Sequence, residues 1–328
     1  MQSPARGAAG LPGRVAKEHI ERMKPYLSVW MRFTAAVVLP LLLAGCGRSD
    51  RVHALPVRET HIWSVPAEES RQPAPRSVAR CGSHELVVLD TAARVLVYGT
   101  NGVLARQWRM PESSVGRPEG VIVLRDGHVV VCDTHYHRVV EFDTTGQVVR
   151  QFGREGQGPG EFIYPVAVAA DDQENLYVAE YGSNDRVQVF TRDGKFMRAF
   201  GAFGTQPGGF QRPSGVAWHA GLVYVADAFN NRIQVFSDQG KFLRVLETPA
   251  LHFPYDLKVE PRGTLMVIEY GAGCLTRLDL DGHLLGRYGS TGSGMDQFAT
   301  PWGLAVTDDG RVIVADTGNR RLVEVVMK

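Results

Sequence analysis

A short pattern recurs six times along this chain of 328 residues. Each copy contains an apolar run that ends in valine, any residue and then an acid. The acids are Asp90, Asp133, Glu180, Asp227, Glu269 and Asp316, and successive acids are 42 to 47 residues apart. A repeat of this length indicates that one structural unit is copied along the chain and that neighbouring copies share a core.

The copy that begins at Tyr164 shows how one unit folds. Apolar runs at residues 166–170 and 175–180 predict two buried strands, and residues 186–190 alternate apolar and polar side chains, as a half-buried strand does. A turn at residues 191–194 ends in glycine, and residues 195–201 supply a fourth strand. Four short antiparallel strands in each of six copies predict an all-β fold, a six-bladed β-propeller.

The last copy lacks its fourth strand, because the chain stops shortly after residues 321–326. A strand-like segment without a partner, residues 61–65, precedes the first copy. We predict that this N-terminal strand pairs with the last blade, which closes the ring and covers two bare sheet edges.

The N-terminal region has the order of features found in a targeting signal. A short positive region that begins at Met31-Arg32 precedes an apolar run at residues 33–43, which is too short to span a bilayer. The run ends in Leu43-Ala44-Gly45-Cys46, which resembles the lipobox of bacterial lipoproteins, although a chance Ala-Gly-Cys is the alternative. We therefore expect an over-extended N-terminus at 1–30, a signal peptide at 31–45, a tether at 46–58 and the propeller at 59–328.

The lipobox resemblance implies that Cys46 carries the lipid anchor and that the mature protein is extracytoplasmic. Gly47 follows the cysteine, where Asp would favour retention at the inner membrane. This rule of the lipoprotein family implies the outer membrane of a Gram-negative bacterium. We expect contact with the membrane only through this anchor.

Charge and cysteine content restrict the function further. The chain has 36 Lys and Arg against 35 Asp and Glu, so no basic excess favours nucleic acid as a partner. The cysteines that remain, Cys81, Cys132 and Cys274, are odd in number and match no zinc spacing, so we interpret them as structural.

Several further motifs make the copies resemble NHL repeats over residues 75–328. Proline opens the first strand of several copies, an Asn-Arg pair follows the acid in two of them, and Phe-Gly ends others. The residues that carry the resemblance are Pro118, Gly120, Pro213, Gly215, Pro301, Gly303, Asn231, Arg232, Asn319, Arg320, Phe152, Gly153, Phe200 and Gly201. The first and fifth copies depart most, because Val95 and Cys274 stand where other copies have arginine.

The repeated acid and arginine are expected to build blades. A charge at the end of a buried strand is costly unless it is paired, so the acid should accept loop amides or pair with the arginine. Because the pattern recurs in nearly every copy, it is interpreted as structural and not catalytic.

Functional residues are sought where the copies differ. In such propellers one face, here called the loop face, collects the loops that enter the first strands and the loops that follow the second strands. We expect this face to bind a protein, peptide or cell-envelope ligand, because Tyr, Trp and Arg dominate binding surfaces. The candidate residues are Arg117, Glu119, His135, Tyr136, His137, Tyr164, Tyr181, Arg212, Tyr255 and Trp302.

Catalysis is the alternative, as a metal-dependent hydrolase or lyase with its site at the mouth of the central channel. His135 and His137 invite a zinc site, but zinc needs a third ligand and usually a fourth. Six-bladed amidating lyases have a similar repeat pattern and place histidine after the opening proline, where this chain has Glu119, Val166, Ser214, Tyr255 and Trp302. Gluconolactonase-like propellers hold a divalent ion with scattered Glu, Asn and Asp side chains, and this alternative stays open. We expect a binding protein more than an enzyme, assign no metal ligand and expect no cofactor.

Overall fold

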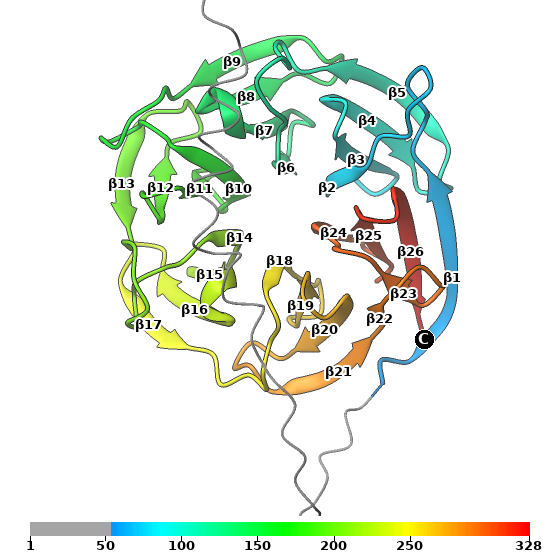
Figure 1. Cartoon of the computed structure of the whole chain (residues 1–328). Coiled ribbons are helices and arrows are strands. Elements are labelled where there is room, and N and C mark those ends of the chain that lie inside the picture. Colours follow the sequence, from blue (N-terminus) through cyan, green and yellow to red (C-terminus); the bar gives the residue numbers. More distant parts are fainter. Residues whose placement is uncertain (1–53) are drawn as a thin grey trace, which may run out of the picture. The chain divides into compact units, whose positions relative to one another are not determined.

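The computed structural model describes residues 54–328, which form six four-stranded antiparallel sheets around a central axis (Figure 1). This confirms the fold class predicted from the repeats. The first strand of each blade borders the axis and the fourth lies at the circumference (Figure 1). The predictions for residues 1–45, for Cys46 and for most of the 46–58 tether concern a part of the chain outside the described residues.

Each blade is given from its inner to its outer strand. Blades one to three consist of β2 (Pro75–Cys81), β3 (Glu85–Asp90), β4 (Arg94–Gly99) and β5 (Leu104–Arg109); β6 (Gly120–Val123), β7 (Val129–Asp133), β8 (Arg138–Phe142) and β9 (Val148–Phe152); and β10 (Tyr164–Ala170), β11 (Leu176–Tyr181), β12 (Arg186–Phe190) and β13 (Phe196–Phe200). Blades four to six consist of β14 (Pro213–His219), β15 (Leu222–Asp227), β16 (Arg232–Ser237) and β17 (Phe242–Val245); β18 (Pro254–Val259), β19 (Leu265–Glu269), β20 (Cys274–Leu278) and β21 (Leu284–Tyr288); and β24 (Gly303–Val306), β25 (Val312–Asp316), β26 (Arg321–Met327) and β1 (Val57–Ser64).

Smaller elements complete the described part of the chain. Two single-turn 3₁₀ helices, η2 (Thr134–Tyr136) and η3 (Ala228–Asn230), follow second strands, and β22 (Ser290–Thr291) pairs in parallel with β23 (Gln297–Phe298). Within residues 54–328, no helix is both long and apolar enough to cross a membrane.

The N-terminal strand closes the ring as expected. β1 pairs antiparallel with β26, from Val57 opposite Met327 to Ser64 opposite Arg321, and starts two residues before the expected boundary at residue 59. Trp63 on this strand is buried and stacks on Tyr98 of blade one, with 6.3 Å between ring centroids. The last blade therefore joins the two ends of the chain's folded part.

The inner strands pack closely, because small residues face the next blade. A Cβ on Gly120 would lie 2.6 Å from the carbonyl oxygen of Val166, and one on Gly303 would lie 2.9 Å from the Cα of Ser77. Glycine is needed at these positions since the backbones of adjacent blades approach so closely.

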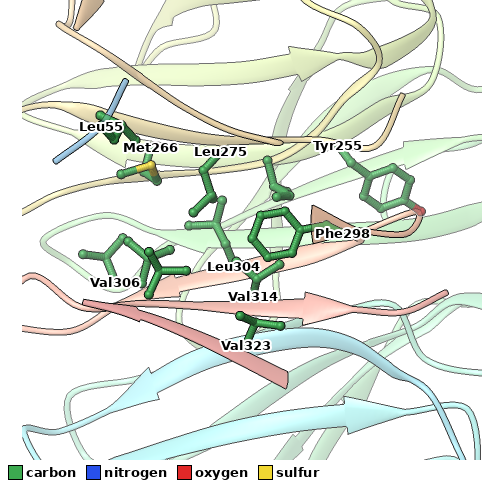
Figure 2. Close-up of a cluster of buried hydrophobic side chains, with 12 residues drawn as sticks. Leu55, Tyr255, Met266, Leu275, Phe298, Leu304, Val306, Val314 and Val323 are labelled. Carbon is green, nitrogen blue, oxygen red and sulfur yellow. The ribbon is translucent and has the colours of Figure 1, made fainter. Parts of the chain in front are cut away.

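The apolar core lies between adjacent blades. Figure 2 shows one such cluster, in which Met266 and Leu275 of blade five face Leu304 and Val314 of blade six. Leu55, just before β1, is buried in the same cluster. Each blade thus depends on its neighbours for burial of its hydrophobic faces.

The repeated acids are buried and paired, as predicted. Glu180 is fully buried, accepts a hydrogen bond from the Ile163 backbone N–H at 2.7 Å and pairs with Arg186 at 2.7 Å. Asp227 makes the same two kinds of contact, with the Gln211 N–H and with Arg232. These acids therefore tie each second strand to the loop that enters its own blade.

In the first and fifth copies, which diverge most, the repeated acid is also paired, but with an arginine from another position. In blade one, Arg94 beside Val95 pairs with Asp90 at 2.7 Å. In blade five, Arg287 from the fourth strand lies 3.4 Å from Glu269, which also accepts a hydrogen bond from Thr276. Although Val95 and Cys274 replace the repeated arginine, an arginine at another position of the same blade pairs with the acid. A buried carboxylate needs such a partner, whichever position supplies it.

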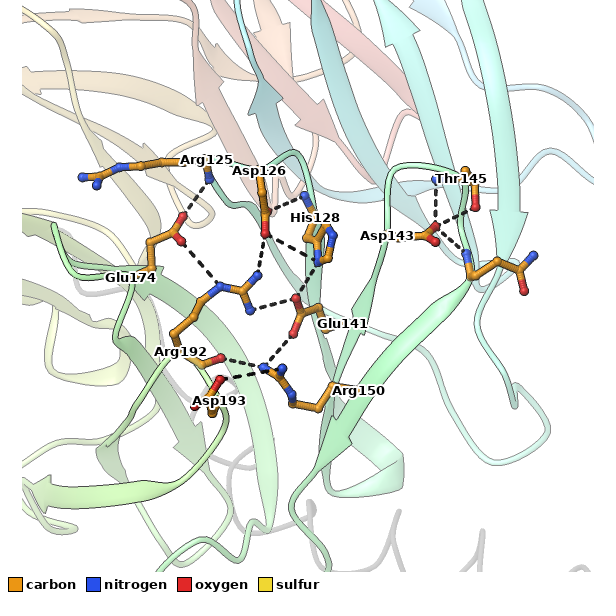
Figure 3. A network of polar contacts seen from close by, with 11 residues as sticks. Arg125, Asp126, His128, Glu141, Asp143, Thr145, Arg150, Glu174, Arg192 and Asp193 are labelled. Carbon is orange, nitrogen blue, oxygen red and sulfur yellow. Dashed lines mark hydrogen bonds and ion pairs between the residues drawn. The ribbon is translucent and has the colours of Figure 1, made fainter.

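The face opposite the loop face carries an ionic network between blades two and three (Figure 3). Arg192 contacts Asp126 and Glu141, each at 2.8 Å, and His128 lies 2.7 Å from Glu141. His128 therefore lies on this opposite face. Its contacts join the hairpins of two blades, which is a structural role.

The three cysteines of the described residues are free. Cys132 and Cys274 are buried, and Cys81 is half-buried. Burial raises the pKa of the Cys132 thiol, and burial together with the charge of Glu269 raises that of Cys274 to about 12. Both thiols are therefore protonated, buried side chains, which supports the structural interpretation.

Candidate functional site

The residue after the opening proline of each first strand points to the mouth of the central channel on the loop face. The six residues at this position, from blade one to blade six, are Arg76, Glu119, Val166, Ser214, Tyr255 and Trp302. Their side chains differ in charge and size, although the backbone around them repeats. The pseudo-sixfold ring therefore presents an asymmetric set of groups at its axis.

A chain of hydrogen bonds connects three of these side chains, and Arg212 in addition, across the mouth. Arg76 Nη2 donates to Glu119 Oε1 at 3.0 Å, and the Tyr255 hydroxyl donates to Glu119 Oε2 at 3.2 Å. The Tyr255 oxygen accepts in turn from Arg212 Nη2 at 3.2 Å. Glu119 is thus held by one guanidinium and one phenol, and both of its oxygens are used.

Aromatic rings stack on both guanidinium groups. The Arg76 Cζ lies 4.1 Å from the centroid of Trp302, and the Arg212 Cζ lies 4.2 Å from the centroid of Tyr181. Tyr255 and Trp302 stack on each other with centroids 5.1 Å apart. Stacking of this kind favours a flat, delocalised cation and fixes its plane.

Burial controls the protonation of this cluster. Burial, reinforced by the charge of Glu119, raises the pKa of Tyr255, so its hydroxyl remains a proton donor. Burial opposes the charge on Arg212, yet the hydroxyls of Tyr255 and Tyr181 and the charge of Glu119 together raise its pKa. The mouth therefore holds two guanidinium cations, one carboxylate and neutral phenols.

The channel is narrow just below the mouth and widens toward the opposite face, where a space of ≈ 250 Å³ is lined by Ala79, Val123, Lys258 and Val306 of the inner strands. The space among the upper inner strands has a volume of ≈ 20 Å³, enough for about one water molecule. Beneath the mouth, Asp256 pairs with Lys258 at 2.6 Å. A ligand of this face must therefore bind at the surface of the mouth and not inside the channel.

The predicted histidine pair serves another purpose. His135 and His137 lie against Tyr164, with ring centroids 5.7 and 5.9 Å apart, and His137 Nδ1 lies 2.5 Å from the Ile163 carbonyl oxygen. In the part of the chain that the structure describes, no three His, Cys, Asp or Glu side chains come together as a metal site. The ring of Tyr164 also packs against that of Tyr181, with centroids 5.3 Å apart, so these aromatic contacts connect the two histidines with the mouth.

Arg117 and Tyr136, two of the predicted binding residues, form hydrogen bonds with loops at the rim of the mouth. Arg117 donates to the carbonyl oxygens of Thr91 at 2.6 Å and Gly116 at 2.9 Å. The Tyr136 hydroxyl lies 3.0 Å from the Val115 N–H and 3.1 Å from the Ser114 hydroxyl. Of the ten predicted residues, the structure thus brings Glu119, Tyr181, Arg212, Tyr255 and Trp302 together, while the other five form the rim around Tyr164 and the second blade.

Sequence reasoning missed two residues of the site. Arg76 follows Pro75, and this Pro-Arg step was the available signal because other copies have proline at the same place. Asp185 is buried and accepts the Arg212 backbone N–H at 2.6 Å, where Arg212 has a left-handed φ of 58°. The available signal was its place directly before the repeated arginine, because Asn231 at the same position of blade four accepts the Phe253 backbone N–H at 2.8 Å in the same way.

Exposed apolar side chains border the mouth. Phe229 on η3 is 52% exposed, although its ring stacks on Phe253 at 5.3 Å. Val115, Phe203 and Met295, in loops that lead into first strands, are also more than half exposed. The loop face therefore combines exposed apolar groups with a stacked arginine, a composition typical of binding surfaces.

Family models match three segments of the chain. The NHL repeat model matches residues 210–236 and 298–324, and a model described as a 6-bladed beta-propeller matches residues 113–185. Among curated proteins, the RING finger protein nhl-1 of Caenorhabditis elegans is 31% identical over 155 residues, which are 47% of this chain and 14% of that protein. The chain thus spans about one seventh of the length of this relative.

Solved structures with low identity share the fold. Virginiamycin B lyase from Staphylococcus aureus aligns with a TM-score of 0.57 at 16% identity, covering 80% of this chain and 83% of that one. A gluconolactonase from Xanthomonas campestris aligns with a TM-score of 0.62 at 16% identity, covering 86% of this chain and all of the other. Together with the observed blades, these matches show that the chain is a six-bladed β-propeller that contains NHL repeats at residues 210–236 and 298–324.

Proposed function

We propose that this protein is a lipid-anchored, extracytoplasmic binding protein that captures a protein, peptide or cell-envelope ligand on its loop face. The observation that carries the proposal is the cluster of Arg76, Tyr181, Arg212 and Trp302 at the mouth, with exposed Phe229 beside it. Aromatic and arginine side chains supply most of the energy of protein interfaces. The channel next to the mouth has a volume of only ≈ 20 Å³, so a ligand that approaches the loop face is expected to bind at its surface.

The position of the first described residues agrees with an anchored orientation. Leu55 and Pro56 line a cavity of ≈ 400 Å³ together with Pro261 and Arg262, which belong to a loop of the opposite face. The chain therefore enters the propeller from that face. This entry point supports our proposal that the protein is anchored through Cys46 with its loop face accessible to a ligand.

Affinity capture from envelope extract tests the proposal. Phe229→Ser changes an exposed residue of the loop face, and Leu285→Ser, on the outer strand β21, is the matched control with 44% exposure. Phe229→Ser is expected to lose the captured partner, whereas Leu285→Ser retains it. Equal capture of the partner by both variants would show that the loop face around Phe229 does not bind it.

A second candidate function is that of a metal-dependent hydrolase or lyase at the channel mouth. The supporting observations are the buried Glu119 and Tyr255 at the axis and the lyase and lactonase activities that the similar folds carry. Metal analysis of the purified full chain separates the two candidates. A stoichiometric divalent ion that Glu119→Gln removes would favour the enzyme over the binding protein.

A further inference from the structure

The charges at the channel mouth do not balance. Arg76 pairs with Glu119, while Arg212 has no carboxylate within 4.0 Å among the ion pairs of residues 54–328. Arg117 at the rim likewise contacts only carbonyl oxygens. Two guanidinium groups therefore share one carboxylate at the mouth, and this leaves an excess positive charge in a partly desolvated place.

Both guanidinium groups have hydrogen-bond donors to spare. The Nε atoms of Arg76 and Arg212 are buried and have no partner, which adds to the cost of burying these cations, so a ligand from solvent would have to bind through the terminal Nη atoms. Arg76 is more than nine-tenths buried, so water supplies little compensation for its charge. A guanidinium has five N–H donors in a fixed plane, and its natural complement is a planar carboxylate.

The protein's own acids near the mouth are already engaged. Both oxygens of Glu119 accept hydrogen bonds, and Asp185 accepts the backbone N–H of Arg212, not its guanidinium. Asp256 pairs with Lys258 below the mouth. The described part of the chain thus offers Arg212 no further anion, and an external one fits the charge that remains.

The surroundings restrict what this anion can be attached to. The rings of Tyr181 and Phe229 lie 4.2 and 5.9 Å from the Arg212 Cζ, and Phe229 is exposed. An apolar residue next to the anionic group would pack on these rings. A carboxylate is planar, so it can bind edge to edge with the guanidinium of Arg212 while the Tyr181 ring covers the face of that group.

We propose that the channel mouth is a carboxylate site that recognises an acidic peptide segment, with Arg212 as the primary ligand-binding residue and Arg76 and Tyr181 supporting it. The proposal rests on the binding function proposed above and names the chemistry of its ligand. The carboxylate comes from a free peptide C-terminus or from an Asp or Glu side chain. Both sources present the same planar anion.

Peptide pools test this directly with the purified full chain in detergent. Three acetylated hexapeptide pools are compared: a pool without acids but with a free C-terminus, the same pool amidated, and an amidated pool with one fixed Asp or Glu. We expect at least about tenfold greater retention of one carboxylate-containing pool over the neutral one, since hydrogen bonds to charged groups are strong. The pool that is retained identifies the source of the carboxylate.

Matched variants assign the effect to the site. Arg212→Gln is expected to reduce retention by at least about tenfold, and Arg154→Gln, an 80% exposed arginine outside the mouth, leaves it unchanged. Thermal unfolding confirms that each variant is folded. If Arg212→Gln is not folded, Arg212→Lys serves instead, because it keeps the charge but loses the planar fork and is expected to weaken binding.

The outcomes separate this inference from the binding function. Equal retention of all three pools, retention of none, or preference for an added phosphopeptide pool overturns the carboxylate site. If Phe229→Ser still abolishes capture of an envelope partner in those cases, the loop face binds through apolar contacts alone. Loss of both effects overturns the binding function as well.

Discussion

Replacement of Trp63 by alanine tests whether the N-terminal strand closes the ring. Trp63 is 7% exposed and lies in a cluster with Val65, Tyr98 and Leu322, which come from both ends of the folded part. Truncation of a buried Trp to Ala lowers the free energy of unfolding by about 3–5 kcal/mol. For a domain of this size the midpoint of thermal unfolding should fall by roughly 6–20 °C.

Ile62→Ala is the matched control, because Ile62 precedes Trp63 on the same strand and is 41% exposed. Its expected effect is below about 1 kcal/mol, since most of its surface is in water already. Urea or thermal unfolding followed by circular dichroism measures both variants. If Trp63→Ala and Ile62→Ala unfold within about 0.5 kcal/mol of each other, β1 does not pack on the last blade and the closure is refuted.

Three further outcomes follow from the sequence and the structure. Cys46→Ala is expected to move the protein from the membrane fraction to the soluble fraction and to abolish incorporation of labelled palmitate, and unchanged labelling would refute the anchor. The carboxylate of Asp279 raises the pKa of His283, so NMR titration of His283 should give a pKa above its usual value, and Asp279→Asn should lower that pKa. Because the pKa is raised by folding, the stability that the His283–Asp279 pair contributes is fully present below the pKa of the unfolded state and is lost as the pH rises through the pKa of the folded state. Burial raises the pKa of Cys132 and Cys274, so both thiols should react with a thiol reagent only after denaturant is added, and rapid reaction of the native protein would contradict the blade packing.

The repeats made the architecture predictable. The opening prolines and the turn glycines determine structure within one copy, and the period repeats them. The strand pattern predicted for one blade therefore applies to the others. The burial of Asp227 and its pairing with Arg232 were predictable for the same reason, because a carboxylate at the end of a buried strand needs a partner close in sequence.

The site was predictable only in part, because it forms between copies. Tyr255 and Glu119 are far apart in sequence, yet they share a hydrogen bond across the axis. Sequence reasoning placed both on the loop face, but their burial depends on Arg76 and Trp302 from two other blades. Arg76 was missed because its copy departs most from the repeat, and Asp185 because its role depends on the fold of the next loop.

The most direct test of the central claim is site-specific photocrosslinking in intact cells. A photoreactive residue replaces Phe229 on the loop face or, as a control, Leu285 on an outer strand, both of which are exposed. The account predicts a discrete protein or peptide adduct from position 229 that Arg212→Gln removes, and none from position 285. Adducts from position 285 alone, or equal adducts from both, would contradict the assignment of binding to the loop face.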